Sequence, residues 1–273
     1  MDSVLRARAN ECAPFENVYT LALRGLHDRA MNASNNMSDR KQMLQDALMA
    51  QRKMLIDATG KRGEDIPQAF TPYKEVLDVY DEGLELPDDV TIIWPDDNYG
   101  YMKRLSSPKE QKRSGRSGVY YHSSYLGKPH DHLWMNTTSP TLMYEELRKA
   151  YDMTADRIWL LNAGDIKACE FAVDFFLSMA YDIASLNFDR AAAYRTEWLC
   201  GMLGDEYRNE YQDVLNSFYK LAFARRPEFM GWGYQWATDK HGRERNTDTD
   251  FSLTNYREVD FRLSEYRRIG SIT

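Results

Sequence analysis

Strand-like and helix-like segments alternate along the first two thirds of the chain, and this order restricts the fold more than any other feature. The strand-like segments are rich in β-branched and aromatic residues and lie at residues 17–23, 68–71, 90–94, 118–121 and 157–161. Apolar residues at helical spacing follow most of them, as at 38–59, where Ser38 is placed to cap the helix and Gly60 to end it. Such alternation predicts a parallel sheet with right-handed crossovers.

This sheet is predicted to be part of an α/β barrel. We expect a (β/α)8 TIM-barrel-like fold that is incomplete, because about five β/α units do not close a barrel of eight. From Cys169 onward the pattern is helical, with segments at about 169–182, 188–203, 205–224 and 252–268 and an irregular loop at 230–250. We therefore predict a partial barrel domain over residues 1–183 and part of an α-helical bundle over residues 184–273.

Polar residues follow every strand-like segment. In the stretch VTIIWPDDNYGY (90–101), an apolar run breaks at Pro95 and continues with two acids, an amide and two tyrosines. A parallel barrel keeps its chemistry at the C-terminal ends of its strands, so polar residues there indicate a functional site. The candidates from the five strand ends are Arg24, His27, Asp28, Tyr73, Glu75, Asp96, Asp97, Asn98, His122, Tyr125, Asn162, Asp165 and Lys167.

Several carboxylates together with Arg, Asn, Tyr and His are suited to sugar chemistry. One carboxylic acid can protonate the leaving oxygen of a glycosidic bond while a second activates water. An arginine can hold a carboxylate on the substrate with two parallel hydrogen bonds. Structural roles compete with these interpretations, since Asp97 and Asp165 could cap helices and Tyr73 could be ordinary packing. The aromatic content of 13% also fits either a sugar site or a tyrosine-rich core.

Composition argues against several other classes of protein. The net charge is −7 and no basic block is present, so nucleic acid is not an expected partner. No apolar run approaches the roughly 20 residues of a membrane span. Cys12, Cys169 and Cys200 are too far apart for a disulfide framework or a metal-ligand spacing. The pair His27-Asp28 is a weak metal motif, and the loop histidines His130 and His132 are expected to be solvated.

Longer motifs in the chain resemble glycoside hydrolase family 115, the xylan α-1,2-glucuronidases. The resemblance rests on WPDDNYGYMKRL (94–105), GVYYHSSYLGKPHDHLW (118–134), LNAGDIKACE (161–170) and ENVYTLALRGLHD (16–28). Two further segments, ARRPEFMGW (224–232) and NYREVDFRLSEY (255–266), resemble the helical bundle of that family. The motifs occur in order over nearly the whole chain, and their combination is specific where any one alone would not be.

The resemblance implies a function and residue roles. Family members remove glucuronic acid, or its 4-O-methyl ether, from α-1,2 linkages on xylan with inversion, without a cofactor, and their helical domain takes part in dimerisation. By this likeness Glu75 is the candidate general acid and Asp28 the candidate base. Arg24 would grip the uronate carboxylate or position the ring. The pocket would be lined by Tyr73, Asp96, Asn98, His122, Tyr125 and Asn162.

Family members are several hundred residues longer than this chain. We therefore expect a fragment that holds strands four to eight of the barrel and has little activity alone. The family is usually secreted or periplasmic, and the N-terminus MDSVLRARANECAPFE lacks a signal peptide, as a missing N-terminal part would explain. Two alternatives stay open: a non-catalytic remnant that binds uronic acid, and a metal-dependent hydrolase that uses His27, Asp28 and His122.

Overall fold

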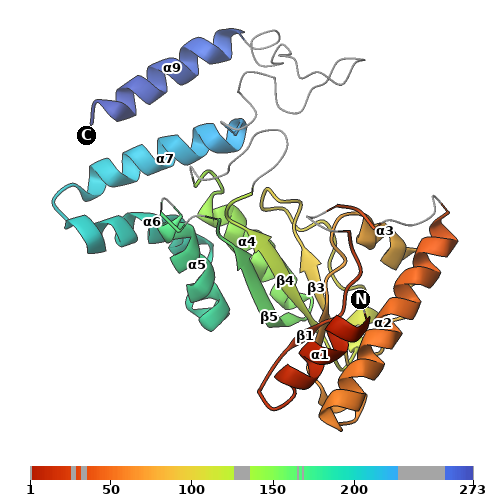
Figure 1. The fold of residues 1–273 in the computed structure, drawn as a ribbon. Helices are drawn as coiled ribbons and strands as arrows, with labels where there is room; N and C mark the ends of the chain where they lie inside the picture. The colour runs from red at the N-terminus through yellow and green to blue at the C-terminus, as the bar shows by residue number, and fades with distance from the viewer. Residues whose placement is uncertain are drawn as a thin grey trace. The chain divides into compact units, whose positions relative to one another are not determined.

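The fold is that of a computed structural model, which describes residues 2–25, 29–31, 36–125, 136–164, 166, 167, 169–226 and 256–272. Five strands form one sheet in the order β1-β2-β3-β4-β5 (Figure 1). They are β1 (Tyr19–Thr20), β2 (Gln68–Phe70), β3 (Thr91–Pro95), β4 (Ser117–His122) and β5 (Ala155–Asn162). The predicted five strands are thus confirmed, and their order in the sheet follows the order of the chain.

The strands are parallel, as the alternation of strands and helices predicts. Paired positions advance together along β1 and β2, along β2 and β3, and along β3 and β4. At the last pair of strands, the N–H of Ser117 donates to the carbonyl of Thr154, and the N–H of Ser123 donates to that of Asn162. Partners that increase in the same direction define a parallel pair. Five sequential parallel strands with their helices are the arrangement of an incomplete α/β barrel.

The first strand is shorter than the predicted residues 17–23. Tyr19 and Leu21 donate to the carbonyls of Pro67 and Ala69 at 2.9 and 2.8 Å. The backbone of Ala22 instead bonds to the side-chain amide of Gln51, which donates to its carbonyl at 2.7 Å and accepts from its N–H at 3.0 Å. The side chain of Gln51, from α2, therefore occupies the backbone N–H and C=O groups of Ala22, which in a longer strand would be available for pairing with another strand.

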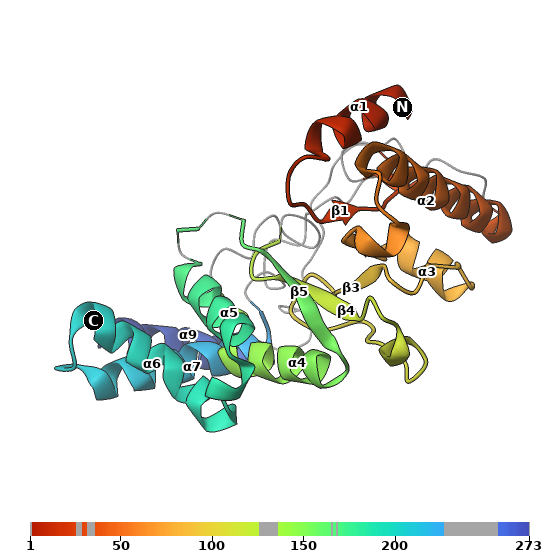
Figure 2. The ribbon, with the colours of Figure 1, turned by 90° about the horizontal axis from the view of Figure 1, so that it is seen from below.

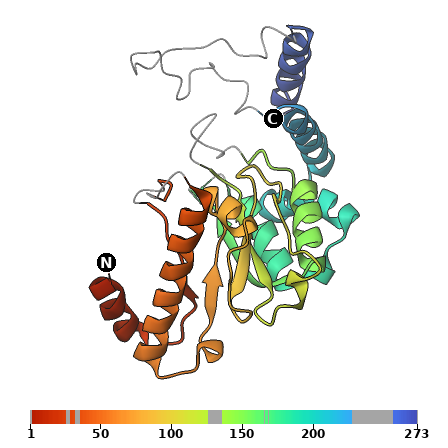
Figure 3. The same cartoon turned by 90° about the vertical axis from the view of Figure 1, so that its right-hand side faces the viewer.

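Three helices accompany the first strands: α1 (Asp2–Cys12), α2 (Met37–Thr59) and α3 (Glu75–Asp81). Figures 2 and 3 both show α1 beside the long α2, with which it makes contact. Gly60 ends α2 in the left-handed conformation at φ 66°, as predicted. The prediction that Ser38 caps this helix is wrong, because Asn36 is the N-cap and its side chain accepts from the N–H of Ser38 at 2.9 Å.

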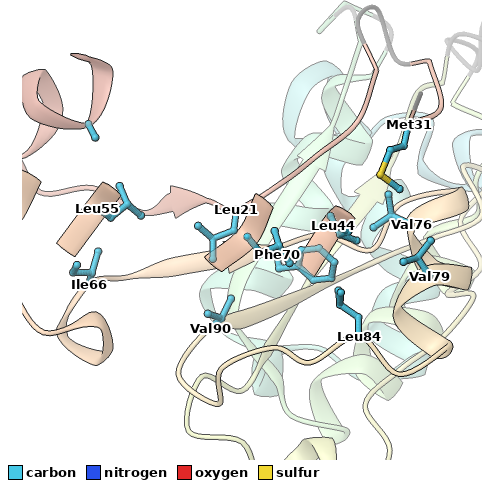
Figure 4. Close-up of a cluster of buried hydrophobic side chains, with 12 residues drawn as sticks. Leu21, Met31, Leu44, Leu55, Ile66, Phe70, Val76, Val79, Leu84 and Val90 are labelled. Atoms are coloured by element: carbon cyan, nitrogen blue, oxygen red, sulfur yellow. The ribbon is translucent and has the colours of Figure 1, made fainter. Parts of the chain in front are cut away.

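An apolar core lies between these helices and the strands (Figure 4). Leu44 and Leu48 of α2 are 0% and 1% exposed, and they join Phe70 of β2 and Val79 of α3. Full burial of one such side chain contributes about 1.5–3 kcal/mol. The core therefore holds the ends of β1 and β2, where candidate site residues follow, against a rigid support.

The remaining helices are α4 (Pro140–Asp152), α5 (Glu170–Tyr181), α6 (Phe188–Leu203), α7 (Arg208–Ala224) and α9 (Tyr256–Gly270). Short 3-10 turns lie at Gly63–Asp65, Glu110–Lys112 and Ile183–Ser185. In contact along the chain are α5 with α6, α6 with α7, and α7 with α9. The helices predicted after residue 169 are confirmed within a few residues at each end, and the predicted loop at 230–250 lies outside the described residues.

The chain divides into two compact units. The first holds residues 1–96, 102–120 and 149–160, and the second holds residues 97–101, 121–148 and 161–273. The predicted domain boundary at residue 183 stays a prediction; it falls at the 3-10 turn inside the second unit. Among the helices that the structure describes, none combines the length and apolar character needed to cross a membrane.

Candidate active site

The first unit brings Arg24 and Glu75 together, 51 positions apart in the sequence. Arg24 follows β1 and Glu75 is the first residue of α3. The Nε and Nη2 groups of Arg24 donate to the two carboxylate oxygens of Glu75 at 3.2 and 3.1 Å. The two side chains are 18% and 20% exposed, so the pair is partly shielded from water while one side stays accessible. This bidentate geometry is the strongest form of arginine–carboxylate pairing.

The third candidate of the first unit, Tyr73, lies directly beside this pair. The guanidinium carbon of Arg24 is 5.3 Å from the centre of the Tyr73 ring, and the Nζ atom of Lys74 is 5.0 Å from it. The ring also meets Tyr120 of β4 edge to face, with the centroids 6.0 Å apart. Two cations, one carboxylate and two phenols thus surround one spot. Such a group suits a negatively charged ligand with a flat or ring-shaped body.

The backbone is strained between Tyr73 and Glu75. Lys74 has φ 52° and ψ −123°, a conformation that residues other than glycine rarely adopt. Strain of this kind costs about 1–3 kcal/mol and persists where the surroundings impose it, often at functional sites. The residue types here do not predict this strain, because lysine carries no preference for positive φ.

The ion pair with Arg24 helps to lower the pKa of Glu75. Burial by itself raises the pKa of the Glu75 carboxyl, but the hydrogen bonds from Arg24 and from the backbone N–H groups of Glu75 and Met31, with the charge of Arg24, outweigh it and lower the pKa. The Met31 N–H donates to Oε1 of Glu75 at 3.2 Å. In this state Glu75 is a carboxylate at neutral pH, whereas a general acid needs a raised pKa.

The turn after β3 separates two acids with different surroundings. Asp96, predicted to bind sugar hydroxyls, is 2% exposed, and its N–H donates to the carbonyl of Tyr120 at 3.1 Å. Asp97 accepts from the N–H groups of Tyr99 and Tyr101 at 2.8 and 3.1 Å, which closes the turn. These bonds agree with the interpretation of Asp97 as structural.

Asn98, the next candidate, lies in that turn with φ 74°, a left-handed conformation that asparagine tolerates better than most residues. It is half-buried, in the second unit. Gly100, two residues on, has φ 95°, and a Cβ there would come within 2.7 Å of the Tyr121 hydroxyl, which donates to the Gly100 carbonyl at 3.0 Å. The turn therefore requires glycine at this position for both conformation and space.

His122, Tyr125 and Asn162 also belong to the second unit. The His122 and Tyr125 rings meet at right angles, 5.7 Å between centroids, and His122 is 1% exposed. The carbonyl of Asn162 accepts from the N–H groups of Ser123 and Ser124 at 3.0 and 3.2 Å. The ends of β4 and β5 thus hold one another, which fixes the backbone that carries these three candidates.

Arg226, which is not among the predicted site residues, joins this group. The ring of Tyr99 meets that of Tyr125 at 6.0 Å and lies 6.0 Å from the guanidinium carbon of Arg226, which donates to the Tyr99 carbonyl and, at 3.1 Å, to the hydroxyl of Thr138. The segment ARRPEFMGW contains Arg226, but nothing in it points to the turn after β3. Its role depends on a contact 127 positions away along the chain.

Other candidates are not placed in either group. His27, Asp28, His130, His132 and Asp165 lie outside the described residues. Lys167 is 97% exposed and pairs with Glu170, as a surface lysine does. Within the described ranges, no three His, Cys, Asp or Glu side chains gather as a metal site would require. None of the three cysteines, all of which the structure describes, forms a disulfide.

Most of the sequence matches one known protein family. The sequence profile of glycosyl hydrolase family 115 matches residues 1–229. The chain belongs to this family. The resemblance seen in the sequence motifs is thereby confirmed.

A solved structure extends the comparison. BtGH115A, described as a family GH115 4-O-methyl-alpha-glucuronidase with specificity for decorated arabinogalactans, matches with a TM-score of 0.88 and 37% sequence identity. The match covers 98% of this chain and 35% of that chain, so this chain spans about a third of the length of the solved protein. No curated protein matches the sequence.

Proposed function

We propose that this chain carries part or all of an inverting glycoside hydrolase that removes glucuronic acid, or 4-O-methylglucuronic acid, from α-1,2 linkages on xylan. The observation that carries the proposal is the Arg24–Glu75 pair beside Tyr73. The pair combines a carboxyl group that could act as the general acid with a cation that can bind a uronate. Membership of family 115 and the likeness to a 4-O-methyl-alpha-glucuronidase support the same reading. No cofactor is needed for this chemistry.

In this mechanism Glu75 donates the proton to the leaving oxygen, and Asp28 activates the attacking water. Inversion requires the two carboxyl groups to be roughly 6.5–9.5 Å apart, so that a water molecule fits between the base and the sugar. Arg24 binds the uronate carboxylate, and Tyr73 supports the ring. The remaining pocket residues in the proposal are Asp96, Asn98, His122, Tyr125 and Asn162.

Because of the ion pair, the uronate group of the substrate would have a second role, which is to change the pKa of Glu75. A substrate carboxylate that takes over hydrogen bonds from Arg24 withdraws them from Glu75. Loss of those hydrogen bonds removes part of what lowers the pKa of Glu75, so the pKa rises and the protonated form that a general acid needs becomes more populated. Under this proposal the substrate's charged group prepares the catalytic acid, and a neutral glucoside would not.

The glycan that carries the uronate is a separate question. The solved relative is described as specific for decorated arabinogalactans, so arabinogalactan is the second candidate substrate beside glucuronoxylan. Incubating the protein with each polysaccharide and measuring released uronic acid distinguishes them. Faster release from xylan supports the first choice, and faster release from arabinogalactan replaces it.

Hydrolysis itself is tested by NMR on glucuronoxylan oligosaccharides. Inversion predicts that the β anomer of the uronic acid appears first, and that Glu75→Gln prevents its release. The matched control is Glu110→Gln, since Glu110 is likewise a half-buried carboxylate that accepts from an arginine, Arg104, at 2.9 Å. Equal loss in both variants would show a general structural effect and would remove Glu75 from the mechanism.

Calorimetry with glucuronate separates the proposal from its alternatives. Binding without any release of uronic acid supports a non-catalytic carbohydrate-binding protein. Release that a chelator abolishes and added metal restores supports a hydrolase based on His27, Asp28 and His122. The absence of both glucuronate binding and uronic acid release would overturn the proposal.

Two expectations about the cell stay proposals. A secreted or periplasmic location fits a polysaccharide substrate, and fractionation of the source cells would test it. The second proposal is a homodimer through the helical domain. Sedimentation of the purified protein in an analytical ultracentrifuge at several concentrations would test it.

A further inference from the structure

The second unit contains a small cavity between α6, α7 and the start of α5. Its volume is about 210 Å³, and aromatic rings of Phe171, Trp198, Phe218 and Tyr219 form much of its wall. Pockets for drug-sized ligands measure roughly 300–1,000 Å³, so this cavity fits a smaller molecule. With about 30 Å³ for each water, it has the volume of about seven waters, enough for one six-membered ring with short substituents.

A buried cation lines this cavity. Arg195 of α6 is 8% exposed, and its guanidinium carbon lies 4.9 Å from the centre of the Tyr219 ring. Its Nη2 group donates to the side-chain carbonyl of Asn216, while its Nε group is buried and has no hydrogen-bond partner among the residues that the structure describes. Burial lowers the pKa of Arg195, which reports the loss of hydration. A charge removed from water needs an anion, and an amide oxygen supplies none.

Arg262 shows how the same unit holds a buried arginine that has an anion. It is 4% exposed, its Nε donates to Glu258 at 2.7 Å, and its Nη2 donates to the carbonyl of Leu221 at 2.9 Å. The carboxylate balances the charge. The carbonyl of Leu221, near the end of α7, also accepts from the N–H of Arg225 at 3.1 Å. Among the residues described, Arg195 has no comparable carboxylate.

A second unsatisfied group lines the same cavity. Asn136 has φ 57°, and its Oδ1 atom is buried with no hydrogen-bond partner in the described part of the chain. Unpaired buried acceptors are rare and each costs about 1–3 kcal/mol. A missing acceptor at Arg195 and a missing donor at Asn136, in one cavity, are complementary to the two ends of a single small molecule.

We propose that this cavity binds a small ring-bearing monocarboxylic acid, with the carboxylate on Arg195 and a hydroxyl group of the ring on Asn136. The aromatic wall fits a flat aromatic acid better than a sugar acid. A sugar acid would bring several hydroxyl groups into a mostly apolar cavity where one acceptor awaits them. This site is distinct in its residues from the glucuronidase site proposed above.

The test is a titration followed through the indole N–H resonance of Trp198, which is assigned with Trp198→Phe. The probes are 4-hydroxybenzoate, its neutral counterpart 4-hydroxybenzyl alcohol, and glucuronate. We expect 4-hydroxybenzoate to bind about tenfold to a hundredfold more tightly than the alcohol, as for a charge-assisted hydrogen bond. Glucuronate binding more tightly at this resonance would identify a sugar acid as the occupant of the same carboxylate site.

Arg195→Met should remove binding of the acid, while Arg268→Met, which changes an arginine paired with Asp213 at 2.6 Å, should leave it unchanged. The unliganded Arg195→Met protein should melt about 2–4 °C higher, because an apolar side chain replaces an unbalanced charge, and Arg262→Met should melt lower. Arg195→Lys gives a second test and should bind weakly. Equal binding of acid and alcohol, or acid binding that survives Arg195→Met, would overturn the proposal.

Discussion

Two arginines of this protein each lie over a tyrosine ring, and they differ in what balances their charge. Arg24 lies 5.3 Å from the centre of the Tyr73 ring and donates two hydrogen bonds to the carboxylate of Glu75. Arg195 lies 4.9 Å from Tyr219 and donates to the amide oxygen of Asn216. A ligand carboxylate must compete with a built-in carboxylate at Arg24, whereas at Arg195 it would be the first anion. The same cation–aromatic contact therefore accompanies an ion pair in one unit and, among the described residues, an arginine without a carboxylate partner in the other.

The largest expected effect comes from making Arg24 resemble Arg195. Glu75→Gln removes the carboxylate, so hydrolysis of a glucuronide should fall about 10²–10⁴-fold through loss of the general acid. Glucuronate should bind several-fold more tightly, because Arg24 no longer prefers an internal anion. Rate assays and calorimetry check the two effects on the same preparation. An unchanged rate, with Glu110→Gln measured in parallel, would contradict the assignment of the acid.

Removing the cation gives the next largest effect. Arg24→Gln should weaken glucuronate binding about tenfold to a hundredfold, since a charge-assisted pair of hydrogen bonds is lost. Binding of methyl glucoside, which lacks the carboxylate, should change little. Calorimetric titration of both sugars measures the contrast. Equal weakening for both would mean that Arg24 shapes the pocket without reading the uronate.

The pH dependence of stability distinguishes the two arginines through Glu75. Its pKa is lower in the folded protein than the unfolded value of about 4.3, so the pair's stabilisation is complete well above pH 4.3 and is lost as pH falls through the folded pKa. For partly exposed side chains this amounts to about 1 kcal/mol. Urea unfolding of wild type and Glu75→Gln between pH 7 and pH 3 should show a difference that shrinks on acidification. A constant difference would refute the coupling.

Arg195 should contribute no such change on the acid side, because its partner Asn216 does not titrate. Arg195→Met and the wild type should therefore keep a constant difference in unfolding free energy over the same pH range. A difference that varies between pH 7 and pH 3 would show that a carboxylate does balance Arg195.

The smallest effect concerns the strained residue between Tyr73 and Glu75. Lys74→Gly relieves about 1–3 kcal/mol of strain and adds about 0.5–1 kcal/mol of chain entropy on unfolding, so a net gain near 1 kcal/mol is expected. Glucuronate binding should weaken slightly as one cation leaves Tyr73. Thr154→Gly is the matched control, since Thr154 also has positive φ, at 73°. It should gain stability with unchanged binding, and a similar loss of binding would refute a local role for Lys74.

Much of the fold could be predicted because its signals are local. Strand composition and helical spacing located β2 to β5, α2 and the helices after residue 169, and Gly60 marked the end of α2. The predictions of a helix cap at Ser38 and of a longer first strand were wrong for related reasons. The polar side chains of Asn36 and Gln51 form hydrogen bonds with backbone groups, and residue spacing in the sequence does not show which polar side chain will form such a bond.

The candidate site was predictable to the same depth. Polar residues after parallel strands pointed to Arg24, Tyr73 and Glu75, and the structure places these three in contact. It also shows what those residue types could not: that the hydrogen bonds from Arg24 help to lower the pKa of the proposed acid, and that the backbone of Lys74 is strained.

The sequence by itself determined the class of fold, the order of its elements, the family and the residues that follow each strand. These properties depend on periodicity and on motifs, which are read within a few positions. The tertiary structure alone decided that Glu75 pairs with Arg24 and that Arg195 is buried with no carboxylate partner among the described residues. Charge balance depends on distances between residues far apart in the chain, and burial sets how much each distance matters, so neither could be read from the order of residues.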